Sequence, residues 1–218
     1  MNLAIYGAGG LGREVLELVR QMEKKEHIWE KVIFVDEKEF SDGVNGITVL
    51  RFDDVIRLYD SANLQFVIAV GEPITRAKLY NKVKNSGYTC AILVHPDVYI
   101  PETTILQEGT VIQKNAFISC NIYIGKNVFI QPAAVVGHDV KIRDNSVISM
   151  NVSIGGACTI NENVYIGLNA SVRELVTIGM DSIIGMGAVV IKDIPQNVIA
   201  FGNPAKPQKS KDCNTVFH

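Results

Sequence analysis

One period dominates the second half of this chain: from Val94 to Val190 every sixth residue is Val, Ile or Leu. Seventeen such positions, called the axial positions below, follow one another without an insertion. Neither an α-helix nor an alternating strand has a period of six. The pattern predicts a parallel β-helix in which each hexad forms one short strand and one corner. Three corners, or 18 residues, would then close one triangular coil with the aliphatic residues stacked inside.

The other hexad positions fit the same geometry. The fourth residue after each axial position is small or β-branched almost throughout. The third is Asn, Asp or Gly in 13 of the 17 hexads, and these residue types tolerate left-handed or tight-turn backbone geometry. An antiparallel sandwich of short strands is the alternative. It would require hairpin turns and a period of two, so the repeat favours the β-helix.

Residues 1–93 follow a different pattern, in which short apolar runs alternate with helix-like segments. Alternation of this kind implies a parallel sheet with helices on its faces. We expect strands at Leu3–Gly7, Lys31–Asp36, Phe66–Gly71 and Cys90–Val94, and helices over 12–25, over 74–86 and from a cap at Asp53 or Asp54 to Tyr59. The chain therefore divides into an α/β, Rossmann-like domain (1–93), an all-β parallel β-helix (94–195) and a tail (196–218) able to cover an end or a face of the coils.

Composition and charge argue against several classes of binding partner, namely nucleic acid, membranes and metal ions. The net charge of -2 gives no electrostatic reason to expect nucleic acid or an anionic membrane. No apolar run is long enough for a membrane span, and the N-terminus lacks a basic leader. The four cysteines form no CxxC and no metal-ligand spacing with histidine, which predicts free thiols in a reducing cytoplasm and no metal.

His138 is the one histidine inside the coils, at an outward corner position, and Asp139 follows it. Histidine is the natural general base near neutral pH; the alternative is a corner that merely carries these side chains. Residues 18 apart stack on one edge, so Gly156 lies one coil above His138, followed by Glu174 and Lys192. A glycine there leaves room for a ligand against the backbone.

A second edge carries Lys114, Pro132, Met150, Leu168 and Met186 at outward positions. Apolar side chains stacked on an exposed corner are unexpected in a monomer. This edge is therefore buried in an oligomer interface, or lines a groove for an apolar ligand arm, or does both.

Gly7, Gly9 and Gly12 form a GxGxxG between the first strand and the first helix. Backbone N–H groups at such a helix start bind a diphosphate, and Asp36 follows at a suitable distance for ribose hydroxyls. About four strands are too few for a dinucleotide fold, which argues against NAD. The alternative is that the glycines only allow the helix to pack on the strand.

Five segments carry a family resemblance: GAGGLGREV, VHPDV, VVGHDVKI, IIGMGAVVIKDIP and FGNPAK. Together they make nearly the whole chain resemble the NeuD/PglD-like sugar acetyltransferases. The resemblance implies a left-handed β-helix and a homotrimer with active sites between subunits. It also implies acetyl-CoA as co-substrate, a nucleotide sugar as acceptor, and no metal.

The resemblance also implies roles for particular residues. His138 would be the general base and Asp139 its helper. Contacts to CoA would come from Gly156, Leu168 and Met186, with Lys192 and Lys206 as candidates for its phosphates. The nucleotide sugar would bind Gly9, Gly10, Leu11, Asp36, Glu37 and Gly71.

The function expected on this basis is N-acetylation of an amino sugar linked to UDP, dTDP or GDP in bacterial surface-glycan biosynthesis. O-acetylation of a sialic acid or another sugar hydroxyl is the alternative, because fold and base would be the same. A γ-type carbonic anhydrase needs three histidines around zinc, and the repeats hold only His138 well inside them, which argues against that class. A non-catalytic nucleotide-sugar-binding scaffold would need no histidine at that corner. The sequence leaves the nucleotide base, the sugar and the acyl chain length open.

Overall fold

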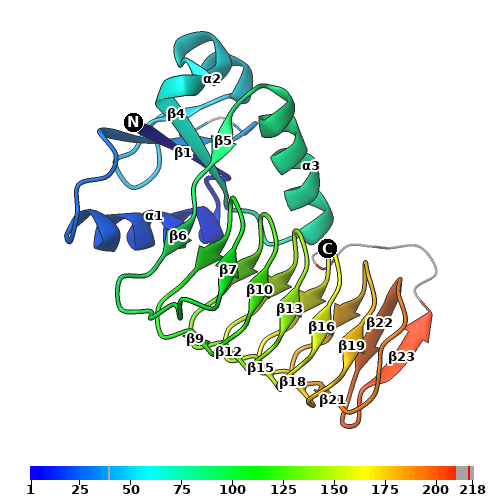
Figure 1. Cartoon of the computed structure of the whole chain (residues 1–218). Coiled ribbons are helices and arrows are strands. Elements are labelled where there is room, and N and C mark those ends of the chain that lie inside the picture. Colours follow the sequence, from blue (N-terminus) through cyan, green and yellow to red (C-terminus); the bar gives the residue numbers. More distant parts are fainter. Residues whose placement is uncertain (39, 210–215, 217–218) are drawn as a thin grey trace.

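The computed structural model of the chain describes residues 1–38, 40–209 and 216. An α/β domain stands on one side of a column of stacked coils (Figure 1). The sheet of the N-terminal domain is parallel, in the order β3-β2-β1-β4-β5. Its strands are β1 (Asn2–Tyr6), β2 (Lys31–Val35), β3 (Val49–Leu50), β4 (Leu64–Ile68) and β5 (Thr89–Cys90), and the helices are α1 (Gly10–Glu23), α2 (Phe52–Leu58), the short 3₁₀ helix η1 (Ser61–Asn63) and α3 (Pro73–Asn85).

The alternation of side chains along β1 divides the domain into two apolar layers. Leu3 and Ile5 belong to the cluster that contains Val15 and Leu16 of α1. Ala4 and Tyr6 point to the other face of the sheet, where they join the cluster of α2 and α3. Successive strand residues face opposite sides, so a single buried strand holds both layers together.

Three expectations for this domain need correction. The apolar run Cys90–Val94 is not one strand: β5 ends at Cys90 and pairs with β4, whereas β6 (Leu93–Val94) already belongs to the coils. Asp53 and Asp54 do not cap α2, because Arg51 is the N-cap residue; they lie in the first turn, where a carboxylate favours the helix dipole. The sheet also has a fifth strand, β3, only two residues long.

The second half forms the predicted coils. Its strands are β6 (Leu93–Val94), β7 (Ile105–Leu106), β8 (Val111–Ile112), β9 (Phe117–Ile118), β10 (Tyr123–Ile124), β11 (Phe129–Ile130), β12 (Val135–Val136), β13 (Lys141–Ile142), β14 (Val147–Ile148), β15 (Ser153–Ile154), β16 (Thr159–Ile160), β17 (Tyr165–Ile166), β18 (Ser171–Val172), β19 (Thr177–Ile178), β20 (Ile183–Ile184), β21 (Val189–Val190), β22 (Val198–Phe201) and β23 (Lys206–Lys209). From β6 to β21, each strand pairs in parallel with the strand 18 residues away, as in Ile124↔Ile142 and Val136↔Ile154. The coil length read from the repeat is thereby confirmed.

These strands form three flat faces, which we name by what they carry. The docked face holds β6, β8, β11, β14, β17, β20, β22 and β23; the Lys141 face holds β7, β10, β13, β16 and β19; the Val135 face holds β9, β12, β15, β18 and β21. Three corners join them. The His138 corner leads from the Val135 face to the Lys141 face, the Asn145 corner from there to the docked face, and the Met150 corner from the docked face to the Val135 face.

The axial residues fill the coil interior as predicted. From Ile112 to Val190 every axial residue is at most 4% exposed. Full burial of one such side chain is worth roughly 1.5–3 kcal/mol. The stack is therefore the main apolar contribution to the stability of the coils.

Every corner from Gly109 to Gly187 has a left-handed residue at the third position after the axial one, with φ between 55° and 76°. Asn and Asp adopt this conformation readily. Ala133, Ala157 and Leu175 adopt it as well, although it is unfavourable for them. The geometry of the closed coil therefore imposes the conformation, and the Asn-rich sequence lowers its cost.

The tail continues the coils as far as it is described. β22 pairs in parallel with β20, and β23 returns antiparallel to β22. The tail therefore extends the docked face at the C-terminal end. Cys213 and His218 lie outside the described residues. Within the described chain, no helix is long and apolar enough to cross a membrane.

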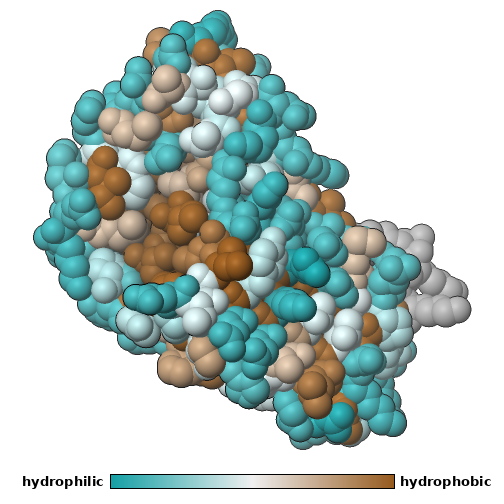
Figure 2. All heavy atoms as spheres, viewed as in Figure 1, coloured by the Kyte–Doolittle hydropathy of each residue, from teal (hydrophilic) through white to brown (hydrophobic). Residues whose placement is uncertain are grey.

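The N-terminal domain packs on the docked face through apolar side chains. Leu93, Val111, Phe129 and Val147 point outward from this face and share one buried cluster with Leu16 of α1. Apolar side chains also reach the surface where the two parts meet (Figure 2). A pocket of about 420 Å³ at this junction is lined by Met22, Ile28, Trp29, Gln65, Cys90, Ala91, Ile92 and Glu108.

Arg76 of α3 is fully buried at this contact. Its guanidinium donates to the carbonyls of Ile68 and Val70 in its own domain, at 2.7 and 3.0 Å. It also donates to the carbonyl and the side-chain oxygen of Asn127 in the coils, at 2.7 and 2.9 Å. Burial lowers the pKa of Arg76 to about 9, so the group remains charged at neutral pH. Four oxygen acceptors, two from each part, thus bind the Arg76 guanidinium between the N-terminal domain and the coils.

His95, at the start of the coils, makes a second contact between the coils and the N-terminal domain. It is 3% exposed, and its Nε2 lies 2.9 Å from Gln21 Oε1 of α1. Its Nδ1 accepts from the N–H of Asp97, which leaves Nε2 as the protonated nitrogen. Burial lowers the pKa of His95, so it is neutral and structural.

Glu108, in the first coil, makes a third contact between the coils and the N-terminal domain. It accepts from Lys84 of α3 and from the N–H of Cys90, both at 2.7 Å. Burial alone would raise the pKa of Glu108, but these hydrogen bonds lower it below the ordinary value of a glutamate. A carboxyl whose pKa is lowered in the folded state stabilises that state above its unfolded pKa, and the contribution is lost as pH falls through the folded pKa.

We therefore expect Glu108→Gln to reduce the free energy of unfolding at pH 7 and to have little effect at an acid pH below the lowered pKa of Glu108, where the native carboxyl is protonated. Urea denaturation of both proteins at the two pH values measures this. Glu102→Gln, on an exposed side chain of the same segment, is the control and should change neither value. An equal loss for Glu108→Gln at both pH values would show that its charge is not what stabilises the junction.

Candidate active site and nucleotide site

His138 and Asp139 form a hydrogen-bonded pair on the His138 corner. The imidazole Nδ1 lies 2.7 Å from Asp139 Oδ2, and the two side chains are 63% and 51% exposed. Hydrogen bonds from His138 and then from Asn121 lower the pKa of Asp139, so the carboxylate is ionised and only accepts. Nδ1 must then carry the proton, which leaves the Nε2 lone pair free to accept one.

Gly156 lies directly above this imidazole, as the 18-residue spacing predicted. A Cβ on Gly156 would lie 2.5 Å from His138 Nε2 and 2.6 Å from Cε1, closer than atoms can approach without a shift. Only glycine leaves the ring where it is. Among the residues that the structure describes, the Gly156 N–H has no acceptor, so it is available beside Nε2 to a ligand oxygen.

Leu168 and Met186 lie on the Met150 corner, one face away from His138. Met186 is 76% exposed and Leu168 is partly buried. A single chain therefore does not bring them to Gly156; a ligand touching both sets needs either to cross the Val135 face or to lie between two copies. Lys192 stands exposed on the His138 corner and Lys206 stands exposed in β23.

The glycine loop at the start of α1 has the geometry of an anion site. The N–H groups of Gly9, Gly10 and Leu11 donate to no acceptor within the described part of the chain. The helix has no acidic residue in its first turn to compete for an anion. A side chain on Gly9 would meet nothing within 4 Å, so the fold itself does not require glycine there. The free space is available to a ligand.

Gly12 has the structural role instead. A Cβ there would overlap the carbonyl oxygen of Gly7, which has φ +110°. The two glycines let α1 start against β1. The packing interpretation of the motif therefore applies to Gly7 and Gly12, and the anion-binding interpretation applies to Gly9 and Gly10.

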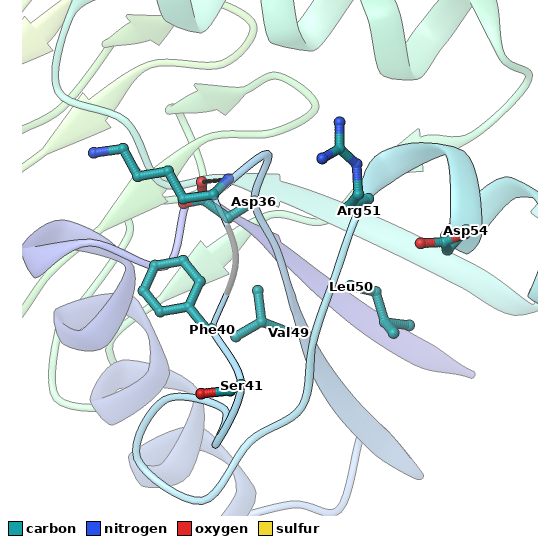
Figure 3. Close-up of a pocket in the computed structure, with 8 residues that line it drawn as sticks. Asp36, Phe40, Ser41, Val49, Leu50, Arg51 and Asp54 are labelled. Atoms are coloured by element: carbon teal, nitrogen blue, oxygen red, sulfur yellow. Dashed lines mark hydrogen bonds between the residues drawn. The ribbon is translucent and has the colours of Figure 1, made fainter.

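Asp36 ties the end of β2 to this loop. Its Oδ2 accepts from the Ala8 N–H at 2.9 Å. Its Oδ1 accepts from the Lys38 N–H at 3.0 Å (Figure 3). A pocket of about 290 Å³ opens beside it, lined by Asp36, Lys38, Phe40, Ser41, Val49, Leu50, Arg51 and Asp54 (Figure 3). The pocket lies beyond the carboxyl end of β2 and beside β3, at the edge where open parallel sheets bind ligands.

Glu37 is held by three side chains. The Tyr6 hydroxyl and Lys82 Nζ each lie 3.2 Å from its Oε1, and Arg51 lies 3.3 Å from its Oε2. Burial and then Glu37 raise the pKa of Tyr6, so the hydroxyl stays protonated as a donor. Gly71 follows β4, next to Val70, whose carbonyl binds Arg76. Asp36, Glu37 and Gly71 thus all follow the carboxyl ends of strands, on the side of the glycine loop.

Two contacts of the site were not anticipated from the sequence. Asn121 donates from Nδ2 to Asp139 Oδ1 at 3.1 Å, and Arg76 anchors the N-terminal domain to Asn127. Asn121 stands 18 residues before Asp139, so the coil length could have identified it. No local pattern marks Arg76. Within the described residues, no group of three His, Cys, Asp or Glu side chains is arranged to hold a metal ion.

Sequence comparison divides the chain in the same way as the structure. Residues 2–83 match the PglD N-terminal domain, residues 121–156 the bacterial transferase hexapeptide family (six repeats) and residues 158–192 the hexapeptide repeat of succinyl-transferase. A curated relative, GDP-perosamine N-acetyltransferase of Escherichia coli, is 30% identical over 127 residues. The match spans 57% of this chain and 57% of that relative.

Solved structures match over almost the whole length. Perosamine N-acetyltransferase from Caulobacter crescentus, a histidine variant in complex with CoA and GDP-perosamine, is 28% identical with a TM-score of 0.88, over 96% of this chain and 98% of the other. The acetyltransferase domain of PglB from Neisseria gonorrhoeae, in complex with acetyl coenzyme A, has the same identity and TM-score over 95% and 98%. WeeI from Acinetobacter baumannii matches equally well over 95% and 100%. These matches confirm the predicted fold class, a Rossmann-like domain followed by a left-handed β-helix.

The contact between Gly156 and the imidazole gives a direct prediction. Gly156→Ala should push the His138 ring away from its position and weaken its bond to Asp139, because the new Cβ would occupy the place beside Nε2. The ¹⁵N chemical shifts of the His138 ring report this change in NMR spectra. Glu174→Ala, one coil further along the same edge, is the control and should leave the shifts unchanged. Unchanged shifts in Gly156→Ala would place the ring elsewhere in solution.

Proposed function

We propose that this chain, which belongs to the NeuD/PglD-like family of sugar acetyltransferases, transfers an acetyl group from acetyl-CoA to the amine of a nucleotide-linked amino sugar. The observation that carries the proposal is the His138–Asp139 pair, whose free Nε2 lies against Gly156. Relatives with this fold were solved with CoA and GDP-perosamine.

The chemistry needs one base and one oxyanion donor. The sugar amine attacks the thioester carbonyl carbon, and His138 Nε2 takes the proton that the amine loses. The Gly156 N–H, which donates to no acceptor among the described residues, would stabilise the oxyanion of the tetrahedral intermediate. When the C–S bond breaks, the imidazolium returns the proton to the sulfur of CoA. Asp139 supports the charged imidazole between the two transfers.

The N-terminal domain would hold the nucleotide. The free N–H groups at Gly9, Gly10 and Leu11 are suited to the diphosphate. Asp36, Glu37 and Gly71 lie beyond the strand ends, beside the pocket of Figure 3. Holding both substrates in fixed positions supplies much of the rate in a reaction of this kind.

CoA would lie between two copies of the chain. Gly156 lies on one corner and Leu168 and Met186 lie on another, so two neighbouring chains would place all three on one CoA molecule without that molecule crossing the Val135 face. The docked face is covered by the N-terminal domain, and the Lys141 face carries a charged side chain at its centre. Within the described part of the chain nothing covers the Val135 face, and its exposed side chains include Phe117 and Val135 at 56% and 40%. A homotrimer closed through this face would put an active site at each subunit boundary.

A reducing compartment suits the chain. Cys90, Cys120 and Cys158 are free thiols, and Cys120 is exposed. Exposed free thiols persist in the cytoplasm rather than in oxidising compartments. We therefore place the reaction in the cytoplasm.

His138→Ala should lower kcat about 10²- to 10⁴-fold, the usual contribution of a general base, with little change in substrate binding. Release of the CoA thiol from acetyl-CoA in the presence of GDP-perosamine measures kcat, and calorimetry measures binding. His27→Ala removes a histidine that is 75% exposed on the other domain, and should behave as the unaltered chain.

Two results would count against the proposal. Full turnover in a folded His138→Ala protein would show that another group is the base. Thiol release with a sialic acid but not with UDP-, dTDP- or GDP-linked amino sugars would favour O-acetylation.

The oligomer gives a separate prediction. Phe117→Glu should dissociate the trimer and reduce turnover at least tenfold, because it places a charge in the proposed interface. Ile105→Glu is matched in exposure, at 54%, but lies on the Lys141 face and should leave the trimer intact. Light scattering coupled to gel filtration gives the mass of each variant. A monomeric unaltered chain, or dissociation by Ile105→Glu alone, would move the interface away from the Val135 face.

A further inference from the structure

The left-handed corner residues form hydrogen-bonded columns along the coils. At the Asn145 corner the side chains of Asn127, Asn145, Asn163 and Asp181 are 18 residues apart. Each amide donates from Nδ2 to the Oδ1 of the next coil, at 2.9, 3.1 and 2.9 Å. The direction is the same at every step. A column of this kind therefore presents one fixed oxygen to the coil below and one fixed amide to the coil above.

The His138 corner contains a single step of the same kind. Asn121 donates from Nδ2 to Asp139 Oδ1 at 3.1 Å, in the direction of the longer column. The next residue of that column is Ala157, which has no side-chain donor or acceptor. The column therefore ends at Asp139, directly beside the base.

This step determines which oxygen of Asp139 meets the base. Asn121 occupies Oδ1, and His138 Nδ1 occupies Oδ2 at 2.7 Å. A carboxylate rotates easily about its last torsion, and the Asp139 side chain is 51% exposed, so water competes for both oxygens. A donor fixed on Oδ1 holds the carboxylate plane and keeps Oδ2 aimed at the imidazole.

Asn121 is itself held in place. Its φ of 57° belongs to the coil corner, and its N–H donates to the Thr103 hydroxyl at 2.9 Å. The N–H of Asp139 donates to the Cys120 carbonyl at 3.0 Å. Two successive corners therefore set the distance between Asn121 and Asp139 through the backbone rather than through flexible side chains.

We propose that Asn121 is a positioning residue for the reaction: it fixes the Asp139 carboxylate so that His138 keeps its proton on Nδ1 and its lone pair on Nε2. This inference rests on the proposed role of His138 as base. Asn121 acts through Asp139 and need not touch either substrate. The competing interpretation is that Asn121 only supplies a residue suited to left-handed backbone, as at other corners.

Three variants separate the two interpretations. Asn121→Asp keeps a side chain suited to the corner but replaces the donor with a second carboxylate facing Asp139. Asn121→Ala removes the donor and strains the corner. Asn115→Ala removes a left-handed Asn of φ 60° that makes no side-chain hydrogen bond within the described residues, and so reproduces the strain alone.

We expect Asn121→Asp and Asn121→Ala to lower kcat about 10- to 100-fold, by analogy with the loss when an outer hydrogen-bond partner of a metal-bound histidine is removed. KM for acetyl-CoA and GDP-perosamine should stay unchanged. Asn115→Ala should keep kcat, although its melting temperature falls with that of Asn121→Ala. The ¹⁵N shifts of His138 should show mixed tautomers in both Asn121 variants and a single tautomer in Asn115→Ala. In an Asp139→Ala background, Asn121→Ala should have no further effect on kcat.

Wild-type kcat and an unchanged tautomer in Asn121→Asp would overturn the proposal, since a corner role alone would then suffice. A further loss of kcat from Asn121→Ala in the Asp139→Ala background would also overturn it, because Asn121 would then act by another route. Failure of the underlying function is distinguishable, because it would appear as full turnover in His138→Ala. The tautomer measurement needs no substrate and stands in either case.

Discussion

The left-handed residue at each corner is the constraint on which the rest of the structure depends. A coil of 18 residues closes only if the backbone turns sharply three times, and from Gly109 to Gly187 each turn uses a positive φ. The axial residues can stack because these corners repeat without an insertion. Ala133, Ala157 and Leu175 show the strength of the constraint, because they adopt the conformation without a favourable side chain.

The same corners carry both the contact with the N-terminal domain and the His138–Asp139 pair. At the Asn145 corner, Asn127 receives the buried guanidinium of Arg76, which fixes the N-terminal domain against the docked face. At the His138 corner, Asn121 holds Asp139, and Asp139 holds the imidazole of His138. The corner residues are structural along most of the repeat. They take on a further role at two places, where Asn127 binds Arg76 of the N-terminal domain and where Asp139 binds His138 below Gly156.

The parts that the sequence predicts well are those fixed by the period. The axial stack, the 18-residue pairing and the position of Gly156 over His138 all follow from the coil length, and the structure confirms them. The split of Cys90–Val94 did not follow, because an apolar run indicates burial without saying in which sheet. Arg76 lies 51 residues from Asn127, so no local pattern connects them. Asn121 reads as an ordinary corner residue, and only its hydrogen bond to Asp139 distinguishes it.

The assignment of His138 as the base is tested most directly by a crystal structure of the unaltered chain with CoA and GDP-perosamine, a pair that cannot react. We predict that the sugar amine nitrogen lies within about 3.2 Å of His138 Nε2, the reach of a base for the proton it removes. The pantetheine sulfur should lie on the Gly156 side of the amine, with Leu168 or Met186 of a neighbouring copy against the pantetheine arm. An amine well beyond hydrogen-bond reach of Nε2, with another titratable side chain beside it, would contradict this assignment of the site.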